Sequence, residues 1–292
     1  MTTEAGSTVP RRQLGRYLRR AREEAGITRE AAARELEWSV QKLWRIENGA
    51  ISMRAIDVRN MGELYAVDHD LTGALMALAR ETKAKGWWQS YRDAIPPHFE
   101  LYVGLETAAT RLRQYEPELI PGLLQTEEYV LALSYVLEPA MSEDERHTRV
   151  AIKLERQALL RRRLPPPPTY QVVLNEQVLR RPLADRAAMS RQLVRLVTVA
   201  ATLHHVSIRV LPLSAGPHPA AAGSMVIMDF APGGAHPEPS TVYCEGATGA
   251  LYLDKESELA KHEEIWAGLD RLVLDATESS DLIAGLAKEY AT

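Results

Sequence analysis

Residues 26–49 read GITREAAARELEWSVQKLWRIENG, and this stretch decides the fold of the first part of the chain. Thr28 and Ser39 are typical helix N-caps, because their hydroxyl groups can accept a free backbone N–H of the first turn. Gly49 suits the left-handed residue with which many helices end. The stretch therefore predicts two short helices joined by a tight turn. The side chains expected to face inward are Ile27, Ala32, Ala33, Leu36, Leu43 and Ile46.

The second of these helices leaves an outward face suited to reading DNA. Gln41 and Arg45 can form paired hydrogen bonds to adenine and guanine edges in the major groove, Val40 can contact a thymine methyl, and Trp44 adds an aromatic side chain. These four residues are our candidates for base contacts. The pattern predicts a helix-turn-helix with this helix in the major groove. The alternative is a helical hairpin with an ordinary solvated face.

Four cations are candidate contacts to DNA phosphates: Arg12, Arg29, Lys42 and Arg54. Phosphate contacts supply affinity and position the protein, but they carry no sequence information. Arg29 has the most favourable place, because it stands in the first turn of a helix, where free N–H groups attract anions. For the arginines of the helix expected over residues 11–24, the alternative is a solvated face paired with acidic neighbours.

The second helix closes on Arg45-Ile46-Glu47-Asn48-Gly49. In this ending the stretch resembles the Xre family of Cro/CI-type repressors, whose second helix commonly ends in Arg-Ile-Glu-x-Gly. The resemblance implies an all-α helix-turn-helix domain, which we place at residues 1–68, and binding to double-stranded DNA. One residue departs from the family pattern, since Glu37 stands where a glycine is usual. A left-handed conformation costs a non-glycine residue roughly 1 kcal/mol, so we expect a strained or differently shaped turn.

Charge is unevenly distributed along the 292 residues. Residues 1–60 hold 12 Lys and Arg against 8 Asp and Glu, whereas the rest of the chain holds 23 against 31. A basic head on an acidic body fits a DNA-binding domain joined to a second domain with another task. The single Cys244 excludes a disulfide framework within the chain and a multi-cysteine zinc site. No apolar segment resembles a signal or membrane-spanning sequence, so we expect a cytoplasmic protein.

After a connecting helix at residues 69–84, residues 85–292 are expected to form an α+β domain with helices first and a small mixed sheet later. Aromatic residues gather between Trp87 and Tyr102, where they indicate a core or an interface, or alternatively a stacking platform for nucleic acid. The expected strands cover residues 169–174, 206–211, 224–230, 241–244 and 251–253. The expected helices cover residues 126–137, 143–163, 185–204, 255–274 and 281–290.

This second region resembles the C-terminal domain of WhiJ-like actinobacterial regulators, a domain largely of unknown function. The matching blocks occur in the same order: Trp87-Trp88, residues 102–106, residues 120–126, Arg156-Gln157, Gln192-Leu193 and residues 210–212. The most specific block is Pro-Gly-Leu-Leu-Gln-Thr, residues 121–126. The resemblance implies a developmental or antibiotic-related regulator with a small BldB-like partner protein. It identifies no ligand.

The sequence lacks the signatures of catalysis that we sought. It contains no phosphate-cradling glycine loop, nucleophile elbow or His-x-x-x-His pattern. Glu116 and Glu118 flank Pro117 like a catalytic pair, but without a partner base they are interpreted as surface charges. His204 and His205 are adjacent on a helix and so do not share a face. We therefore expect no enzymatic activity, cofactor or metal.

Together these patterns predict a homodimeric, sequence-specific transcriptional regulator, controlled through its C-terminal domain by a small protein partner or ligand. Two alternatives remain open. An antitoxin-like interaction module would form a tight complex with a small protein encoded nearby, with DNA binding secondary. A small-molecule sensor would instead show a thermal shift with a metabolite.

Overall fold

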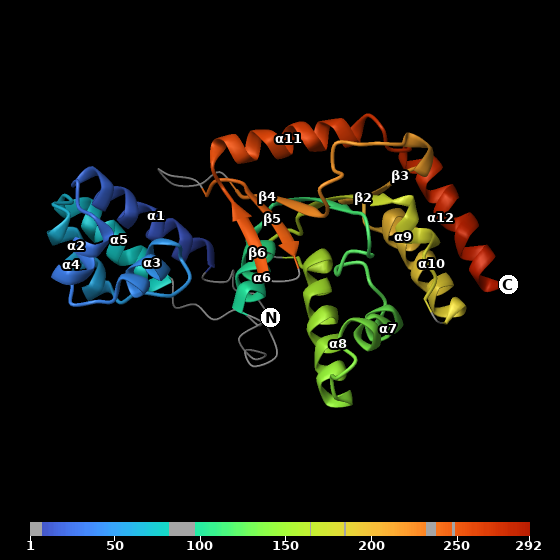
Figure 1. The fold of residues 1–292 in the computed structure, drawn as a ribbon, viewed down its shortest axis with the longest axis horizontal. Coiled ribbons are helices and arrows are strands. Elements are labelled where there is room, and N and C mark those ends of the chain that lie inside the picture. The colour runs from blue at the N-terminus through green and yellow to red at the C-terminus, as the bar shows by residue number, and fades with distance from the viewer. Residues whose placement is uncertain (1–7, 82–96, 164, 184, 232–237, 247–248) are drawn as a thin grey trace. The chain divides into compact units, whose positions relative to one another are not determined.

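The computed structural model describes residues 8–81, 97–163, 165–183, 185–231, 238–246 and 249–292. These residues fall into two compact units, of which the first holds the N-terminal helices and the second holds the sheet (Figure 1). The fold class predicted from the sequence is confirmed: an all-helical helix-turn-helix region precedes an α+β region with one mixed sheet. None of the helices in these ranges combines the length and the apolar character needed to cross a membrane.

Five helices build the helix-turn-helix region. They are α1 (Thr8–Glu24), α2 (Arg29–Glu35), α3 (Val40–Glu47), α4 (Ala55–Leu64) and α5 (His69–Glu81). Four of the six side chains expected to face inward are buried, and Ile27 and Leu36 pack against them half-buried. Leu75 and Ala79 of α5 lie in the same core as Leu14 of α1. The helix that we expected to connect the domains is therefore also part of the first core.

Four of these helices end in the same way, with a residue in the left-handed conformation. The residues are Gly26, Glu37, Gly49 and Ala66, with φ angles of 68°, 54°, 67° and 54°. After each, the next N–H bonds a carbonyl five residues earlier, as in Trp38 N to Ala33 O (2.8 Å) and Ala50 N to Arg45 O (2.8 Å). This is the Schellman ending, which satisfies carbonyls that the helix leaves free. The left-handed conformation expected at Glu37 is confirmed, and the turn keeps its hydrogen bonds.

Replacing Glu37 by glycine is expected to stabilise the helix-turn-helix region by about 0.5–1 kcal/mol, because relief of left-handed strain outweighs the entropy gained by the unfolded chain. Hydrogen exchange of peptides from residues 13–75 in the full chain measures the change. Glu35→Gly is the control, since a glycine at the exposed last residue of α2, which has no positive φ, should instead cost up to about 1 kcal/mol. A loss of stability in both variants would contradict the strain at Glu37.

The second unit is built on a six-stranded sheet with the order β3-β2-β1-β4-β5-β6. Strands β1, β2 and β3 are parallel, and β4, β5 and β6 continue from β1 in antiparallel pairs. Five strands agree with those predicted, but the central β1 was not predicted. The strands are β1 (Arg111–Glu116), β2 (Thr169–Asn175), β3 (Val206–Leu211), β4 (Met225–Asp229), β5 (Thr241–Gly246) and β6 (Gly249–Leu253).

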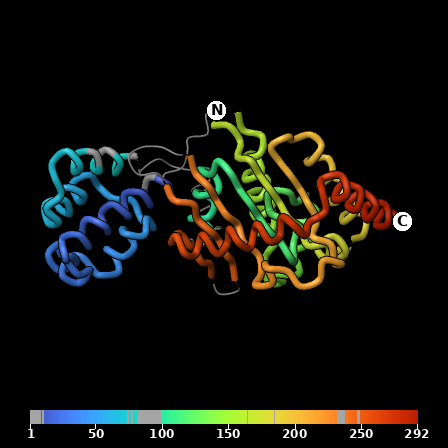
Figure 2. Tube along the Cα trace, turned by 90° about the horizontal axis from the view of Figure 1, so that it is seen from above, coloured from blue at the N-terminus to red at the C-terminus, as the bar shows by residue number. Residues whose placement is uncertain are grey.

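Helices cover the sheet. On one face α11 packs Trp266 and Leu269 against Tyr115, Val173 and Ile227, and Figure 2 shows this helix running along the sheet. The helices of this unit are α7 (Glu127–Leu137), α8 (Glu143–Gln157), α9 (Glu176–Arg180), α10 (Arg186–Thr202), α11 (Glu256–Asp270) and α12 (Ala276–Ala291). Helix α6 (Pro97–Ala108) belongs, from Phe99 onward, to the first unit. Two 3-10 turns, η2 (Ala158–Arg161) and η3 (Leu213–Ala215), complete the second unit. The segment expected to be helical over residues 143–163 is therefore α-helical only as far as Gln157.

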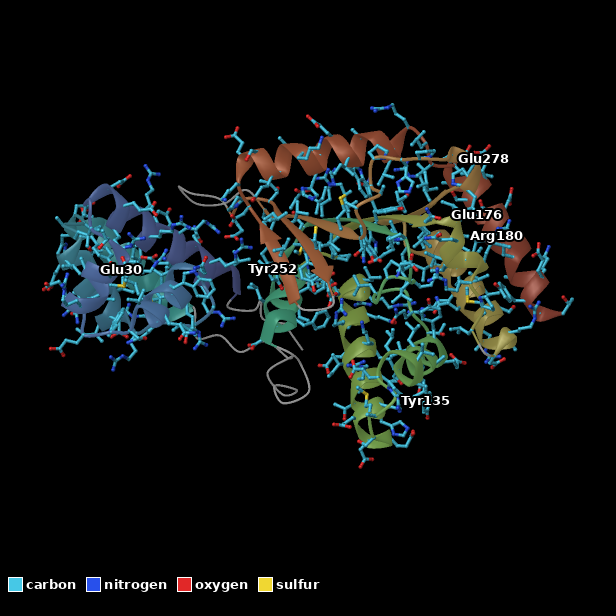
Figure 3. All side chains as sticks on the ribbon, viewed as in Figure 1. Glu30, Tyr135, Glu176, Arg180, Tyr252 and Glu278 are labelled. Atoms are coloured by element: carbon cyan, nitrogen blue, oxygen red, sulfur yellow. The ribbon has the colours of Figure 1, made fainter. Side chains whose placement is uncertain are left out.

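A buried glutamate joins the ends of two parallel strands. Glu176, which follows β2, accepts hydrogen bonds from Leu213 N (2.8 Å) and from Arg180 Nε (2.6 Å). Leu213 lies just after β3, and Figure 3 shows Glu176 beside Arg180 on α9. The carboxylate therefore fixes α9 to the segment after the neighbouring strand.

Glu116 is half-buried at the end of β1 and accepts a hydrogen bond from Gln114 Nε2 (2.7 Å), so its interpretation as a surface charge was wrong. Burial raises the pKa of its carboxyl to about 7.

Of the aromatic residues noted in the sequence, Trp87 and its neighbours before residue 97 lie outside the described residues. Phe99 and Tyr102 stack on α6 with ring centroids 5.3 Å apart.

Candidate nucleic-acid interface

Helix α3 presents the four predicted base-contact residues on one exposed face. Ser39 begins the helix, with its Oγ accepting a hydrogen bond from Lys42 N (3.1 Å). Because Leu43, Ile46 and Glu47 are buried, the opposite side of the short helix faces solvent. Val40 is 42% exposed and Trp44 49%, and both Gln41 and Arg45 are exposed as well.

The polar groups on this face are open to a ligand. Within the described part of the chain, neither Gln41 nor Arg45 makes a side-chain hydrogen bond or ion pair. An amide and a guanidinium without internal partners can form the paired hydrogen bonds that distinguish purine edges. Trp44, with half of its surface in solvent, would lose that exposed apolar area on contact with a ligand.

Two of the candidate phosphate contacts, Lys42 and Arg54, are at least partly exposed to solvent. The Lys42 Nζ lies 3.7 Å from the centroid of the Trp38 ring, a cation–π contact that holds the ammonium beside the turn. Arg54 precedes α4 and is exposed, and its Nη2 donates to Asp57 Oδ1 (2.8 Å). This hydrogen bond lowers the pKa of the Asp57 carboxyl. Trp38 was not among the residues singled out from the sequence, although it stands four residues before Lys42.

Arg12 and Arg29 have internal acidic partners and do not join the exposed set. Arg12 is only 6% exposed, and its guanidinium lies 3.5 Å from the Glu238 carboxylate of the same compact unit. Its backbone packs on the end of α3, since a Cβ at Gly49 would lie 2.6 Å from the Arg12 Cα. Arg29 Nε donates to Glu47 Oε2 at 3.1 Å.

Glu47 is the residue that fixes α3 in place. Its carboxylate is fully buried and accepts from Arg22 Nε (2.5 Å) and Nη2 (3.1 Å), as well as from Arg29. Arg22 also donates to Ile27 O (2.9 Å), so one network joins α1, the start of α2 and α3. Arg22 was missed in the sequence, because nothing in its neighbourhood indicates a partner 25 residues away.

A glycine allows α1 and α3 to meet backbone to backbone. A Cβ at Gly15 of α1 would lie 2.5 Å from Ile46 O and 2.8 Å from Glu47 O. Only a residue without a side chain fits this approach. The sequence signal, a glycine inside a predicted amphipathic helix, was present but was not used. Gly15 and Glu47 together determine which side of α3 remains exposed.

Comparison with protein families finds two matches. A helix-turn-helix domain family matches residues 13–75, and the family described as "Domain of unknown function (DUF5753)" matches residues 99–285. The first match covers α1 to the middle of α5, and the second runs from α6 into α12. In the same comparisons, no curated protein and no solved structure matches the chain.

Proposed function

We propose that this chain, which belongs to the DUF5753 family and carries a helix-turn-helix domain ahead of that domain, is a sequence-specific DNA-binding transcriptional regulator. One observation carries the proposal. The exposed face of α3 combines Gln41, Arg45, Val40 and Trp44, and its two polar side chains have no internal partner among the described residues. A buried ion-pair network holds this helix rigidly, as sequence reading requires.

In this proposal Gln41 and Arg45 bind base edges, and Val40 and Trp44 make apolar contacts in the major groove. Lys42 and Arg54 bind phosphates. Arg29 binds a phosphate through the guanidinium N–H groups that do not bond to Glu47. Arg12 can bind a phosphate only once its buried guanidinium has moved away from Glu238.

The remaining features of the proposal rest on the resemblance to Xre-type and WhiJ-like regulators. The protein would act in the cytoplasm as a homodimer, with two copies of α3 meeting half-sites about one helical turn, roughly 34 Å, apart. The second domain would have no enzymatic role and would transmit control from a small BldB-like partner protein or a ligand. An antitoxin-like module remains the competing function, and it predicts only weak, salt-sensitive binding to any DNA.

Arg45→Ala is expected to weaken binding to the specific site by about 1–3 kcal/mol and to relax discrimination at one base pair. Fluorescence anisotropy with the chain's own upstream intergenic DNA and with random DNA, at two salt concentrations, measures both effects. Arg59→Ala removes another exposed arginine, from α4, and should leave base discrimination unchanged. An equal loss on specific and random DNA would refute the assignment of Arg45 to a base.

A further inference from the structure

The second unit contains a hollow that neither the helix-turn-helix nor the sheet explains. It has a volume of about 330 Å³, within the range of small-molecule sites. The start of α7, the end of η2 and one side of α10 surround it. Its lining residues are Thr126, Glu128, Arg161, Arg191, Val194, Arg195, Thr198 and Val199.

Three arginines line this hollow, and only one of them is neutralised by acids. Arg191 pairs with Glu128 (3.1 Å) and lies 3.5 Å from Asp185. Arg195 instead donates to neutral acceptors, Leu124 O at 3.2 Å and Gln157 Oε1 at 2.6 Å. Arg161 makes no hydrogen bond or ion pair with the described residues. Glu128 also lines the hollow but is paired with Arg191, so neither Arg161 nor Arg195 has a carboxylate partner among the described residues.

This arrangement is unfavourable for the protein alone. Burial lowers the pKa of the Arg195 guanidinium, and the charge of Arg161 lowers it further. The contacts with Leu124 and Gln157 hold Arg195 in position despite that repulsion. An anion placed between the two guanidinium groups would neutralise them, and arginine is well matched to phosphate and carboxylate through paired hydrogen bonds.

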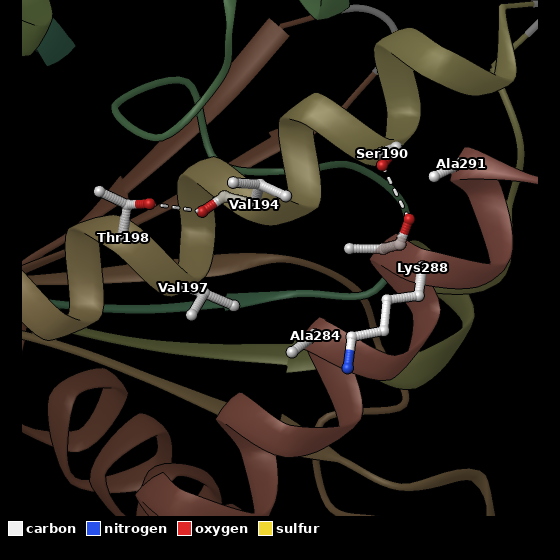
Figure 4. Close-up of a pocket in the computed structure, with 8 residues that line it drawn as sticks. Ser190, Val194, Val197, Thr198, Ala284, Lys288 and Ala291 are labelled. Atoms are coloured by element: carbon white, nitrogen blue, oxygen red, sulfur yellow. Dashed lines mark hydrogen bonds between the residues drawn. The ribbon is translucent and has the colours of Figure 1, made fainter.

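An apolar surface continues from the hollow across α10. A second hollow, of about 320 Å³, lies between α10 and α12 and shares Val194 and Thr198 with the first (Figure 4). Val194 is 53% exposed at the boundary between them. The other lining residues are Ser190, Val197, Ala284, Ala287, Lys288 and Ala291, most of them small or apolar. A ligand held at the arginines can therefore place an apolar part over Val194.

We propose that this hollow binds a small organic anion, whose phosphate or carboxylate is held by Arg161 and Arg195 and whose apolar part lies over Val194. The site would give the second domain a ligand of defined chemistry. As a means of controlling DNA binding it rests on the proposed function, but the binding itself can be measured without DNA.

Isothermal titration of the full-length protein with phenyl phosphate, benzoate and inorganic phosphate tests the site. We expect one of the two organic anions to bind at about 1 mM or more tightly, and the preferred one identifies the charged group. Phenyl phosphate should bind more tightly than inorganic phosphate if phosphate is preferred. Arg161→Gln should weaken binding about tenfold, because it removes a charged hydrogen-bond donor. Arg163→Gln is the matched control, since it removes an exposed arginine two residues away.

The proposal is overturned if neither phenyl phosphate nor benzoate binds more tightly than inorganic phosphate, or if Arg161→Gln and Arg163→Gln weaken binding equally. Circular dichroism first establishes that each variant is folded, and Arg191→Gln serves as a second variant of the hollow with the same expected direction. DNA binding is measured separately without any of these anions. A failure of anion binding is therefore distinguishable from a failure of the regulator itself.

Discussion

Glu47→Gln is expected to destabilise the helix-turn-helix domain by about 3–5 kcal/mol, the cost of breaking a buried ion pair by removing one partner. The Glu47 carboxylate has no exposed surface and accepts from both Arg22 and Arg29. Glutamine keeps the shape but removes the charge, so the buried Arg22 guanidinium loses its counterion. Because the same network positions α3, specific DNA binding should fall as well.

Hydrogen exchange of peptides from residues 13–75 in the full chain reports this loss separately from the second domain. The control is Glu24→Gln, which makes the same chemical change in the exposed Arg20–Glu24 pair and should leave protection unchanged. Equal protection in Glu47→Gln and Glu24→Gln would show that the buried network does not stabilise the domain.

Gly49→Ala is expected to cost about 3 kcal/mol, since it combines left-handed strain with overpacking. Gly49 has a φ of 67°, and a Cβ there would lie 2.6 Å from the Arg12 Cα and 2.7 Å from its N. These are backbone atoms of α1, so the contact can be relieved only by moving a helix. Urea unfolding of the full chain, followed by hydrogen exchange in the same peptides, measures the change.

Gly26→Ala separates the two causes. Gly26 ends α1 with nearly the same φ, 68°, but a Cβ there would meet no atom within 4 Å. It should therefore cost only about 1–2 kcal/mol from the backbone conformation. If Gly26→Ala and Gly49→Ala cost the same, the contact between the added Cβ and α1 contributes nothing to the cost of Gly49→Ala.

The helix-turn-helix could be predicted from the sequence because its signals are local. Thr28 and Ser39 cap their helices as expected, with Oγ accepting from Ala31 N (3.2 Å) and Lys42 N (3.1 Å). The spacing of apolar residues then predicted that Val40, Gln41, Trp44 and Arg45 lie on the exposed side of α3. Both signals act within a few residues, so the sequence alone is enough.

Strand β1 could not be predicted because its stability depends on distant residues. Its centre reads Arg113-Gln114-Tyr115, which lacks the apolar pattern of a buried strand. Arg113 is buried and pairs with Glu263, 150 residues later, and Gln114 accepts from the hydroxyl of Tyr170, 56 residues later. These partners compensate for the burial of polar groups only once the fold has formed.

The candidate sites also divide into features set by local sequence and features set by tertiary packing. The exposure of Gln41 and Arg45 follows from helical periodicity, whereas the acidic partners of Arg12 and Arg29 are set by tertiary packing. The basic hollow gave no sequence signal, because Arg161 comes from a different element than the arginines of α10. A motif search finds residues that are close along the chain, and this cluster is close only in space.

The place of β1 at the centre of the sheet has a consequence for how the chain is made on the ribosome. The core of the first domain is complete once Ala79 has been synthesised, but β1 must wait for β2 and for β4, which ends at Asp229. Domains generally fold as units, N-terminal first, at roughly 5–20 residues per second. The helix-turn-helix domain therefore has a complete core many seconds before the second domain can close its sheet.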